Sequence, residues 1–184
     1  MKMVGISGSI REKSLNTLLL KVAADLTPDE IEFEVVKIDS IALYNEDIDN
    51  ENRPGVIAEY LNKINGADVI LFASPEYNHG MSGVLKNAID WASRPAFQSP
   101  LLNKPCGILT ASKSPVGGAR AQADLKNVLS STLSIIYPAN EYLLPNAHEK
   151  FDESGSLVDS AASRRLKRYV EGLVSWVDNY NTLN

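Results

Sequence analysis

The sequence DVILFASPEYNHGMSGVLKNAIDW, residues 68–91, contains the pattern on which the expected fold depends. Its first six residues form a continuous apolar run, which is typical of a strand buried on both faces of a sheet. Polar residues and glycines follow at once, and apolar residues then recur at helical spacing, at Leu85, Ala88, Ile89 and Ala92. A buried strand that passes through a polar loop into a helix is the repeating unit of a parallel α/β sheet.

The same order of strand, loop and helix recurs along the whole chain. Strands are predicted at 2–7, 31–38, 68–73, 105–111 and 134–137, and helices at 15–26, 54–64, 85–94, 119–133 and 160–180. Five such repeats predict a parallel sheet with helices on both faces. The polar segment 39–53 is the longest stretch without periodicity, and we expect it to be a functional or contact loop rather than a domain boundary. We therefore expect residues 1–184 to form one domain.

Composition and charge narrow the class of protein. The 184 residues carry a formal net charge of −5. The densest basic stretch, RRLKR at 164–168, is predicted to be a solvated helix face, so we expect no nucleic-acid binding. The apolar runs are strand-sized, which predicts no membrane span. The N-terminal MKMVGIS indicates a strand rather than a signal peptide, and the single Cys106 is compatible with a reducing compartment. We therefore expect a cytoplasmic protein.

The residues after the first predicted strand favour an anion site. In an open parallel sheet, ligands bind beyond the carboxyl ends of the strands. GISGSIREKSLNT, residues 5–17, places hydroxyl, amide and guanidinium donors before and within the start of a helix, where a phosphate is well held. These donors are Ser9, Arg11, Ser14, Asn16 and Thr17. The stretch matches neither the Walker A loop nor GxGxxG, and the alternative interpretation is a polar turn with Ser14 as the N-cap of the helix.

The loops after the third and fourth predicted strands favour a flat ring. Tyr77 and Asn78 offer an aromatic face and hydrogen bonds to a heterocycle, although a polar turn with a helix cap at Ser82 would look the same. A lone loop histidine is more often incidental than a proton donor, so a catalytic role for His79 is the less favoured interpretation. The glycine-rich SKSPVGGAR, residues 112–120, would close the other edge of a ring pocket, or would simply cap the next helix.

Four motifs together resemble the NADPH-dependent FMN reductase family, and in particular its chromate, quinone and azo-dye reductase branch. They are GSIRxxSxN at 8–16, PEYN at 75–78, GxLKNAIDW at 83–91 and GGAR at 117–120. The likeness extends from residue 3 to about residue 140. It implies a flavodoxin-like fold, in which a five-stranded parallel sheet of order 2-1-3-4-5 lies between two layers of helices. The family commonly has proline where this chain has Ser82, a difference that we expect to leave FMN binding intact because both residues suit a helix start.

The resemblance also implies which residues contact FMN. Around the phosphate it places Ser9, Arg11, Ser14, Asn16 and Thr17, and along the isoalloxazine ring it places Pro75, Glu76, Tyr77 and Asn78. Ser112 and the Gly117–Gly118 turn would complete the pocket. No metal is implied, and no catalytic acid or base is named because the flavin itself carries the chemistry. A homodimer or homotetramer is implied, with Tyr77, Arg120 and Glu141 at positions associated with subunit contacts.

The implied function is an FMN-dependent NAD(P)H oxidoreductase. Such an enzyme takes hydride from NADH or NADPH and passes electrons to a small-molecule acceptor, which is a quinone, an azo compound, a metal oxyanion or free flavin. One alternative is a flavodoxin-like FMN electron carrier without nicotinamide turnover, and another is a non-enzymatic protein that has lost the flavin. The modest net charge of −5 and the single aromatic residue in the ring loops favour the enzyme over the carrier.

Overall fold

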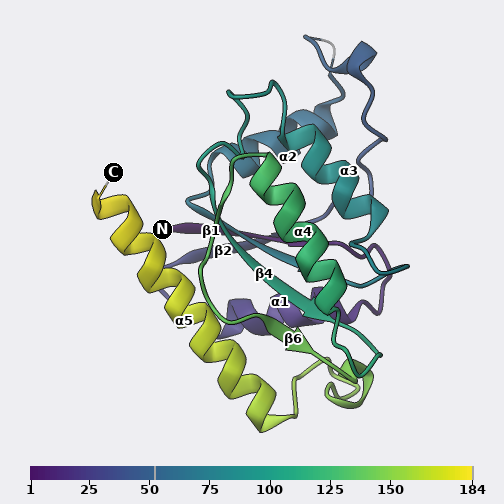
Figure 1. The fold of residues 1–184 in the computed structure, drawn as a ribbon, viewed down its shortest axis with the longest axis vertical. Helices are drawn as coiled ribbons and strands as arrows, with labels where there is room; N and C mark the ends of the chain where they lie inside the picture. Colours follow the sequence, from purple (N-terminus) through teal and green to yellow (C-terminus); the bar gives the residue numbers. More distant parts are fainter. Residues whose placement is uncertain (52, 184) are drawn as a thin grey trace.

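The computed structural model describes residues 1–51 and 53–183, and it contains a parallel sheet between two layers of helices (Figure 1). The strands are β1 (Lys2–Ser7), β2 (Glu32–Val36), β3 (Val69–Ser74), β4 (Pro105–Ala111), β5 (Ile135–Ile136) and β6 (Tyr142–Leu144). The helices are α1 (Leu15–Asp25), α2 (Gly55–Asn65), α3 (Gly83–Ala92), α4 (Ala119–Ser131) and α5 (Ser160–Leu183), with short 3-10 turns η1 (Glu46–Ile48) and η2 (Ala147–Glu149). The strand order β2-β1-β3-β4-β5 is the one expected of a flavodoxin-like sheet.

The central strand β3 contributes side chains to the hydrophobic core on both faces of the sheet. All six of its residues are buried, as its continuous apolar run predicts. Leu71 and Ala73 belong to the cluster formed with α1 and α5, whereas Ile70 and Phe72 belong to the cluster formed with α2, α3 and α4. Successive side chains of a strand point to opposite faces, so β3 alone contributes to both halves of the core. Cys106 on β4 lies in the second cluster, and burial raises the pKa of its thiol to about 12, as befits a core residue.

Strands β1, β3 and β4 end at nearly the same level of the sheet. Ser7 at the end of β1 pairs with Ala73, and Ser74 at the end of β3 pairs with Thr110, one residue before the end of β4. The three loops that follow therefore begin side by side. We call residues 8–14, 75–82 and 112–118 the first, second and third edge loops, respectively.

The fifth strand position lies where it was predicted, but it is divided into two short pieces. Only two residues of the expected strand 134–137 pair, as β5, with Pro105 and Cys106. The unpredicted β6 pairs farther along β4, with residues 109–111. Between them, the backbone N–H of Ile108 donates a hydrogen bond of 2.8 Å to the Tyr169 hydroxyl from α5. The edge of the sheet is therefore formed by two short strands with a side chain between them.

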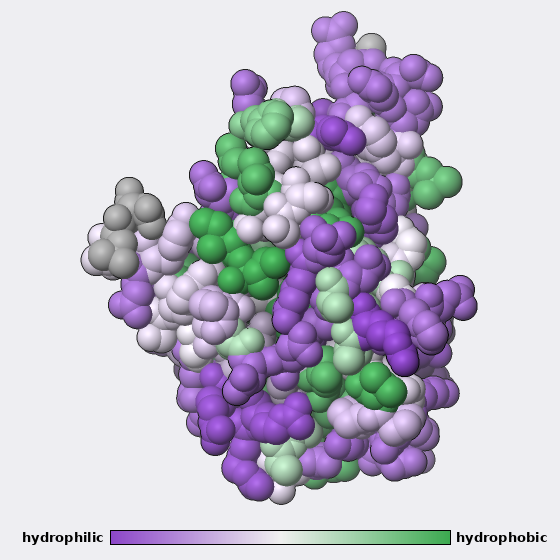
Figure 2. Space-filling view, in the orientation of Figure 1, coloured by the Kyte–Doolittle hydropathy of each residue, from purple (hydrophilic) through white to green (hydrophobic). Residues whose placement is uncertain are grey.

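Helix α3 holds the beginning of the long segment 39–53. The Asn87 amide accepts a hydrogen bond from the Tyr44 N–H (2.7 Å) and donates one to the Ala42 carbonyl (2.9 Å). The Trp91 indole donates to the same carbonyl (2.8 Å), and its ring meets Tyr44 edge-on, with centroids 4.9 Å apart. Trp91 is thus a packing residue. Residues 46–51 of the segment project beyond the body of the molecule, and Figure 2 shows that projection to be hydrophilic.

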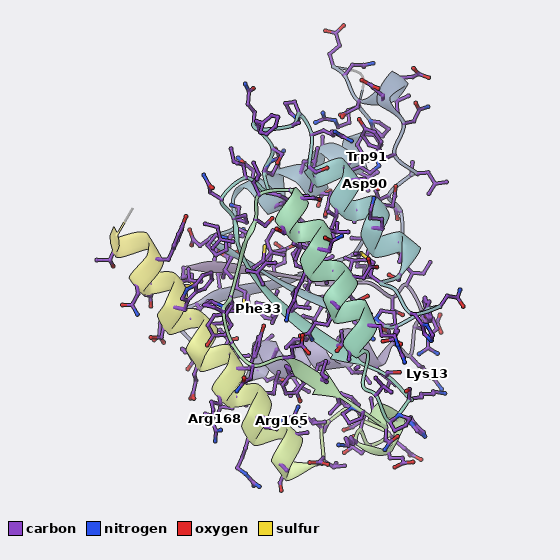
Figure 3. The ribbon with its side chains drawn as sticks, viewed as in Figure 1. Lys13, Phe33, Asp90, Trp91, Arg165 and Arg168 are labelled. Carbon is purple, nitrogen blue, oxygen red and sulfur yellow. The ribbon has the colours of Figure 1, made fainter. Side chains whose placement is uncertain are left out.

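The basic stretch on α5 is solvated, as predicted. Arg164, Arg165, Lys167 and Arg168 are exposed, while Leu166 between them is buried in the core. Figure 3 labels Arg165 and Arg168 on this helix. Within the described residues, no helix is both long and apolar enough to span a membrane.

Side chains cap the helices that begin at this edge. The Ser14 and Ser82 hydroxyls accept hydrogen bonds from the N–H groups of Thr17 and Leu85, three residues into the starts of α1 and α3, as predicted for N-caps. Helix α4 has Gly118 at its N-cap, which has no side chain to serve this purpose. Its first N–H groups therefore need acceptors from outside the N-cap residue.

Glu76 of the second edge loop caps α4. Its carboxylate accepts hydrogen bonds from the N–H groups of Arg120 (3.0 Å) and Ala121 (3.3 Å), and the Arg120 guanidinium lies 3.4 Å from it. Partial burial alone would raise the pKa of Glu76, but these donors outweigh burial and hold that pKa below its usual value. The second edge loop and the start of the helix after the third are thereby joined by one carboxylate.

This arrangement predicts a pH-dependent stability. Because the folded-state pKa of Glu76 is lowered, its contribution is complete above the unfolded-state pKa and is lost as the pH falls through the folded-state value. Glu76→Gln should lower the free energy of unfolding by about 0.5–2 kcal/mol at pH 7, and the difference from the wild type should shrink below pH 4.5. Urea unfolding at several pH values measures both effects.

Glu30→Gln is the control, because it removes the same charge at an exposed site. It should change the free energy of unfolding by less than about 0.5 kcal/mol. A Glu76→Gln effect equally large at pH 3 and pH 7 would contradict the capping role of the ionised carboxylate.

Candidate functional site

A cavity of about 340 Å³ opens among the three edge loops, at the carboxyl ends of β1, β3 and β4. Its walls are formed by Ser9, Arg11, Leu15, Asn16, Pro75, Glu76, Tyr77, Ala111, Ser112 and Lys113. This volume lies in the range typical of sites for small organic ligands. The position is also the one where open parallel sheets bind ligands.

A second, larger hollow of about 520 Å³ lies between β2 and α2. Lys63 in its wall forms ion pairs with Glu59 (3.0 Å) and Glu34 (2.9 Å), and the hollow lies beside an edge strand instead of among the loops of the central strands. The cavity among the edge loops is therefore the better candidate for a functional site.

One end of this cavity is rich in hydrogen-bond donors. Arg11 is exposed there and donates to the Lys13 carbonyl at 3.3 Å, which leaves most of its five N–H donors available. The N–H groups of Leu15 and Asn16, in the first turn of α1, have no intrahelical acceptor by the geometry of a helix. Figure 3 shows Lys13 of the same loop on the side toward which β4 and β6 point. A guanidinium beside a helix N-terminus is an arrangement that suits a phosphate.

Ser14, Asn16 and Thr17, which were also predicted for this end, form side-chain hydrogen bonds within the protein. Ser14 is buried and caps α1, and the Thr17 hydroxyl donates to the Ser7 hydroxyl at 2.8 Å. Neither Ser14 nor Thr17 is part of the cavity wall. Asn16 is part of it, but its amide Nδ2 donates to the Ala111 carbonyl (3.0 Å) and its Oδ1 accepts from the Ala111 N–H (2.9 Å).

The second edge loop forms a tight turn. Tyr77 and Gly80 exchange two backbone hydrogen bonds of 3.0 Å, and the residues between them, Asn78 and His79, have φ angles of 50° and 67°. Two positive φ angles are what a type I′ turn requires, and asparagine is favoured there. Asn78 and His79 are exposed at the tip, away from the cavity wall. Tyr77 at the base is half-exposed and faces the cavity.

The third edge loop depends on Gly117 and Gly118, whose φ angles are +70° and +89°. A Cβ atom on Gly118 would lie 2.8 Å from the Cβ of Thr110, and one on Gly117 would lie 3.0 Å from the backbone nitrogen of Pro145. Both glycines are buried and outside the cavity wall. They shape the path of the loop, while Ser112 at its start lines the cavity.

Three residues of the cavity wall were not predicted. Leu15 and Ala111 are apolar, so a search for polar motifs passes over them. Lys113 follows Ser112 in the third edge loop, and its position beside a predicted site residue was the available signal. The wall thus combines a polar end with apolar surface from Leu15, Ala111 and Pro75.

FMN fits this set of residues. Arg11, Ser9 and the start of α1 match an anionic phosphate, and the backbone of Pro75, the half-exposed Tyr77 ring and Ser112 provide surface and hydrogen bonds for a flat heterocycle. Among residues 1–51 and 53–183, no group of three or more His, Cys, Asp or Glu side chains is placed to hold a metal ion.

Known proteins resemble this chain over nearly its whole length. The family model described as NADPH-dependent FMN reductase matches residues 1–149. An NAD(P)H-dependent FMN reductase of Pseudomonas aeruginosa is 42% identical over 178 residues, which cover 96% of this chain and 95% of the relative. A 2-hydroxy-1,4-benzoquinone reductase of a Burkholderia species is 33% identical over 177 residues, which cover 96% of each chain.

A solved structure gives the same result. The flavoenzyme NAD(P)H:(acceptor) oxidoreductase FerB of Paracoccus denitrificans superposes with a TM-score of 0.89 at 31% identity, and the match covers 97% of both chains. The flavodoxin-like sheet, the cavity at its carboxyl edge and these similarities agree with one another. The chain belongs to the NADPH-dependent FMN reductase family.

Proposed function

We propose that this protein is an FMN-dependent oxidoreductase that oxidises NADH or NADPH and reduces a small-molecule acceptor. The observation that carries the proposal is the cavity among the edge loops, which has phosphate-binding groups at one end and apolar and aromatic surface at the other. FMN, when bound, supplies the hydride-accepting ring. The protein supplies the binding, the orientation and the electrostatic environment of that ring.

The contacts in this proposal follow the walls of the cavity. Ser9, the Arg11 guanidinium and the free N–H groups at the start of α1 bind the phosphate. Tyr77 and the backbone beside Pro75 line the ring on one side, and Ser112 lines it on the other. Ser14, Thr17, Asn78, Gly117 and Gly118 give these loops their shape.

No side chain is assigned as a catalytic acid or base. The Glu76 carboxylate is engaged by α4, and the donors there lower its pKa, which disfavours a proton-donating role. His79 lies at the exposed tip of a turn. The chemistry then rests on the flavin and on the placement of the two substrates.

Quinones are the acceptors that the comparison with relatives supports best, because several of the relatives are named quinone reductases or quinone oxidoreductases. Azo compounds, metal oxyanions and free flavin remain within the proposal. We further propose a single cytoplasmic domain spanning residues 1–184, without nucleic-acid partners, that forms a homodimer or homotetramer. Tyr77, which is 50% exposed beside the cavity, is available for such a subunit contact.

The direct test is spectroscopic. The purified protein mixed with FMN should show the flavin absorbance bands, and anaerobic NADH or NADPH should bleach them. A quinone should then restore the bands and sustain steady-state NAD(P)H oxidation. Bound FMN without nicotinamide turnover would instead establish an electron carrier, and a protein that takes up no FMN would establish a non-enzymatic role.

Arg11 provides a test of the phosphate end. Arg11→Ala should weaken FMN binding by about 1.5–3 kcal/mol, the value of a charge-assisted hydrogen bond. Riboflavin has the ring but no phosphate, so its affinity should stay unchanged. Titrations monitored by flavin fluorescence measure both dissociation constants.

Lys13→Ala is the matched control, because Lys13 is a neighbouring cation that is not part of the cavity wall. It should alter FMN affinity by less than about threefold, as expected for an exposed charge. Equal losses for Arg11→Ala and Lys13→Ala would mean that general positive charge, and not the Arg11 contact, holds the phosphate.

His79 provides a test of the turn. Glycine adopts positive φ without steric cost, so His79→Gly should raise the free energy of unfolding by up to about 1 kcal/mol and leave turnover unchanged. His79→Ala removes the imidazole but keeps a Cβ atom, so it should leave turnover unchanged without the gain in stability. A large loss of turnover in both variants would show that the imidazole takes part in proton transfer.

A further inference from the structure

We propose that the side chain of Asn16 is a positioning residue that holds the two walls of the cavity at a fixed distance, and that its main role is not to bind phosphate. This inference rests on the proposed function, because it concerns how the same cavity holds FMN. It assigns the side chain an effect on the ring end of the site, through Ala111 and the third edge loop.

The contacts of Asn16 carry the argument. Its Oδ1 accepts from the Ala111 N–H at 2.9 Å and its Nδ2 donates to the Ala111 carbonyl at 3.0 Å. The side chain is only 3% exposed, and the two residues are 95 positions apart. The Asn16 amide thus bonds both the backbone N–H and the backbone carbonyl of Ala111, as the backbone of a neighbouring strand would do. One N–H of the Asn16 amide is left over for any other partner.

The place of this pair in the fold gives it an effect on the cavity. Asn16 is the second residue of α1, directly behind the donor-rich end. Ala111 is the last residue of β4, and Ser112 and Lys113 follow it in the opposite part of the wall. On its other side, Ala111 pairs with Leu144 of β6. The start of the third edge loop is therefore fixed between β6 and α1, and the amide sets its distance from the phosphate end.

Loss of the amide should release the third edge loop from α1 without removing any group from the phosphate end. The backbone N–H of Asn16 and the Arg11 side chain would both remain. We therefore expect ligands with and without a phosphate to lose the same share of their affinity. A side chain that bound the phosphate directly would behave differently, because its loss would weaken the binding of FMN and leave the binding of riboflavin unchanged.

Gln122 on α4 is a matched control. It is also a buried amide, 1% exposed, whose Nε2 donates to the Tyr142 carbonyl (3.2 Å) and to the Thr110 hydroxyl (3.4 Å). It therefore joins a helix to β4 and β6 one residue away from Ala111, and it is not part of the cavity wall. Gln122→Ala removes the same chemical group from the same part of the sheet.

The experiment compares FMN and riboflavin titrations of the full chain for the wild type, Asn16→Ala, Arg11→Ala and Gln122→Ala. The titrations are run at a temperature at which circular dichroism shows every variant to be folded. Asn16→Ala should raise the dissociation constants of both flavins by the same factor of about ten, which is the scale expected for lost buried hydrogen bonds. Arg11→Ala should weaken the binding of FMN alone, and Gln122→Ala should weaken the binding of neither flavin.

Two additions keep the test decisive. If Asn16→Ala does not fold, Asn16→Gln keeps the amide but displaces it by one methylene group, and the same equal loss is expected. The visible circular dichroism of bound FMN, recorded at saturation, reports the surroundings of the ring. It should change in the Asn16 variant and stay unchanged in Arg11→Ala.

Three results would overturn the inference. Loss of FMN affinity with riboflavin affinity intact would make the Asn16 side chain a phosphate ligand. Unchanged affinity for both flavins would leave it a purely structural residue, and equal losses in Asn16→Ala and Gln122→Ala would indicate general loosening of the sheet. A wild-type protein that binds neither flavin would instead overturn the proposed function, and this inference with it.

Discussion

The common level at which β1, β3 and β4 end is the constraint on which the site depends. The register Ser7 with Ala73 and Ser74 with Thr110 brings three loops to one edge, and each loop leads into a helix whose first N–H groups need acceptors. Serine caps serve α1 and α3 from within their own loops. Glu76 serves α4 from the neighbouring loop. The loops consequently stabilise one another, and the cavity is formed by a connected set of bonds.

Much of this fold could be predicted because its signals are local. The continuous apolar run of β3 and the alternation of strands and helices lie within short windows of sequence, as do the caps Ser14 and Ser82. The fifth strand position was predicted in the right place, but its division into two short pieces was not. Its two pieces, β5 and β6, have two and three residues, which is too short for any periodicity to be visible. Their pairing depends on β4, about 30 residues away.

The site shows the same division between local and distant causes. Position after a strand and hydrogen-bonding chemistry correctly indicated that Ser9, Arg11, Tyr77 and Ser112 share a cavity wall. The bonds of Glu76 and Asn16 were not foreseen, because their partners lie 44 and 95 residues away along the chain. A polar residue in such a loop looks like a ligand contact until its partner is known. Whether these residues contact FMN stays a prediction, and the structure shows what else they do.

The Tyr169 hydroxyl that accepts from the Ile108 N–H gives α5 a further role. An unpaired stretch of strand is a template on which another chain can add a strand, and proteins cover such stretches to avoid aggregation. The gap between β5 and β6 is a stretch of this kind, on an otherwise hydrophobic strand. By filling it with a side chain, α5 shields the molecule from intermolecular strand addition. The C-terminal helix thus covers an open stretch in the middle of β4, a role that is separate from the cavity at the carboxyl end of the same strand.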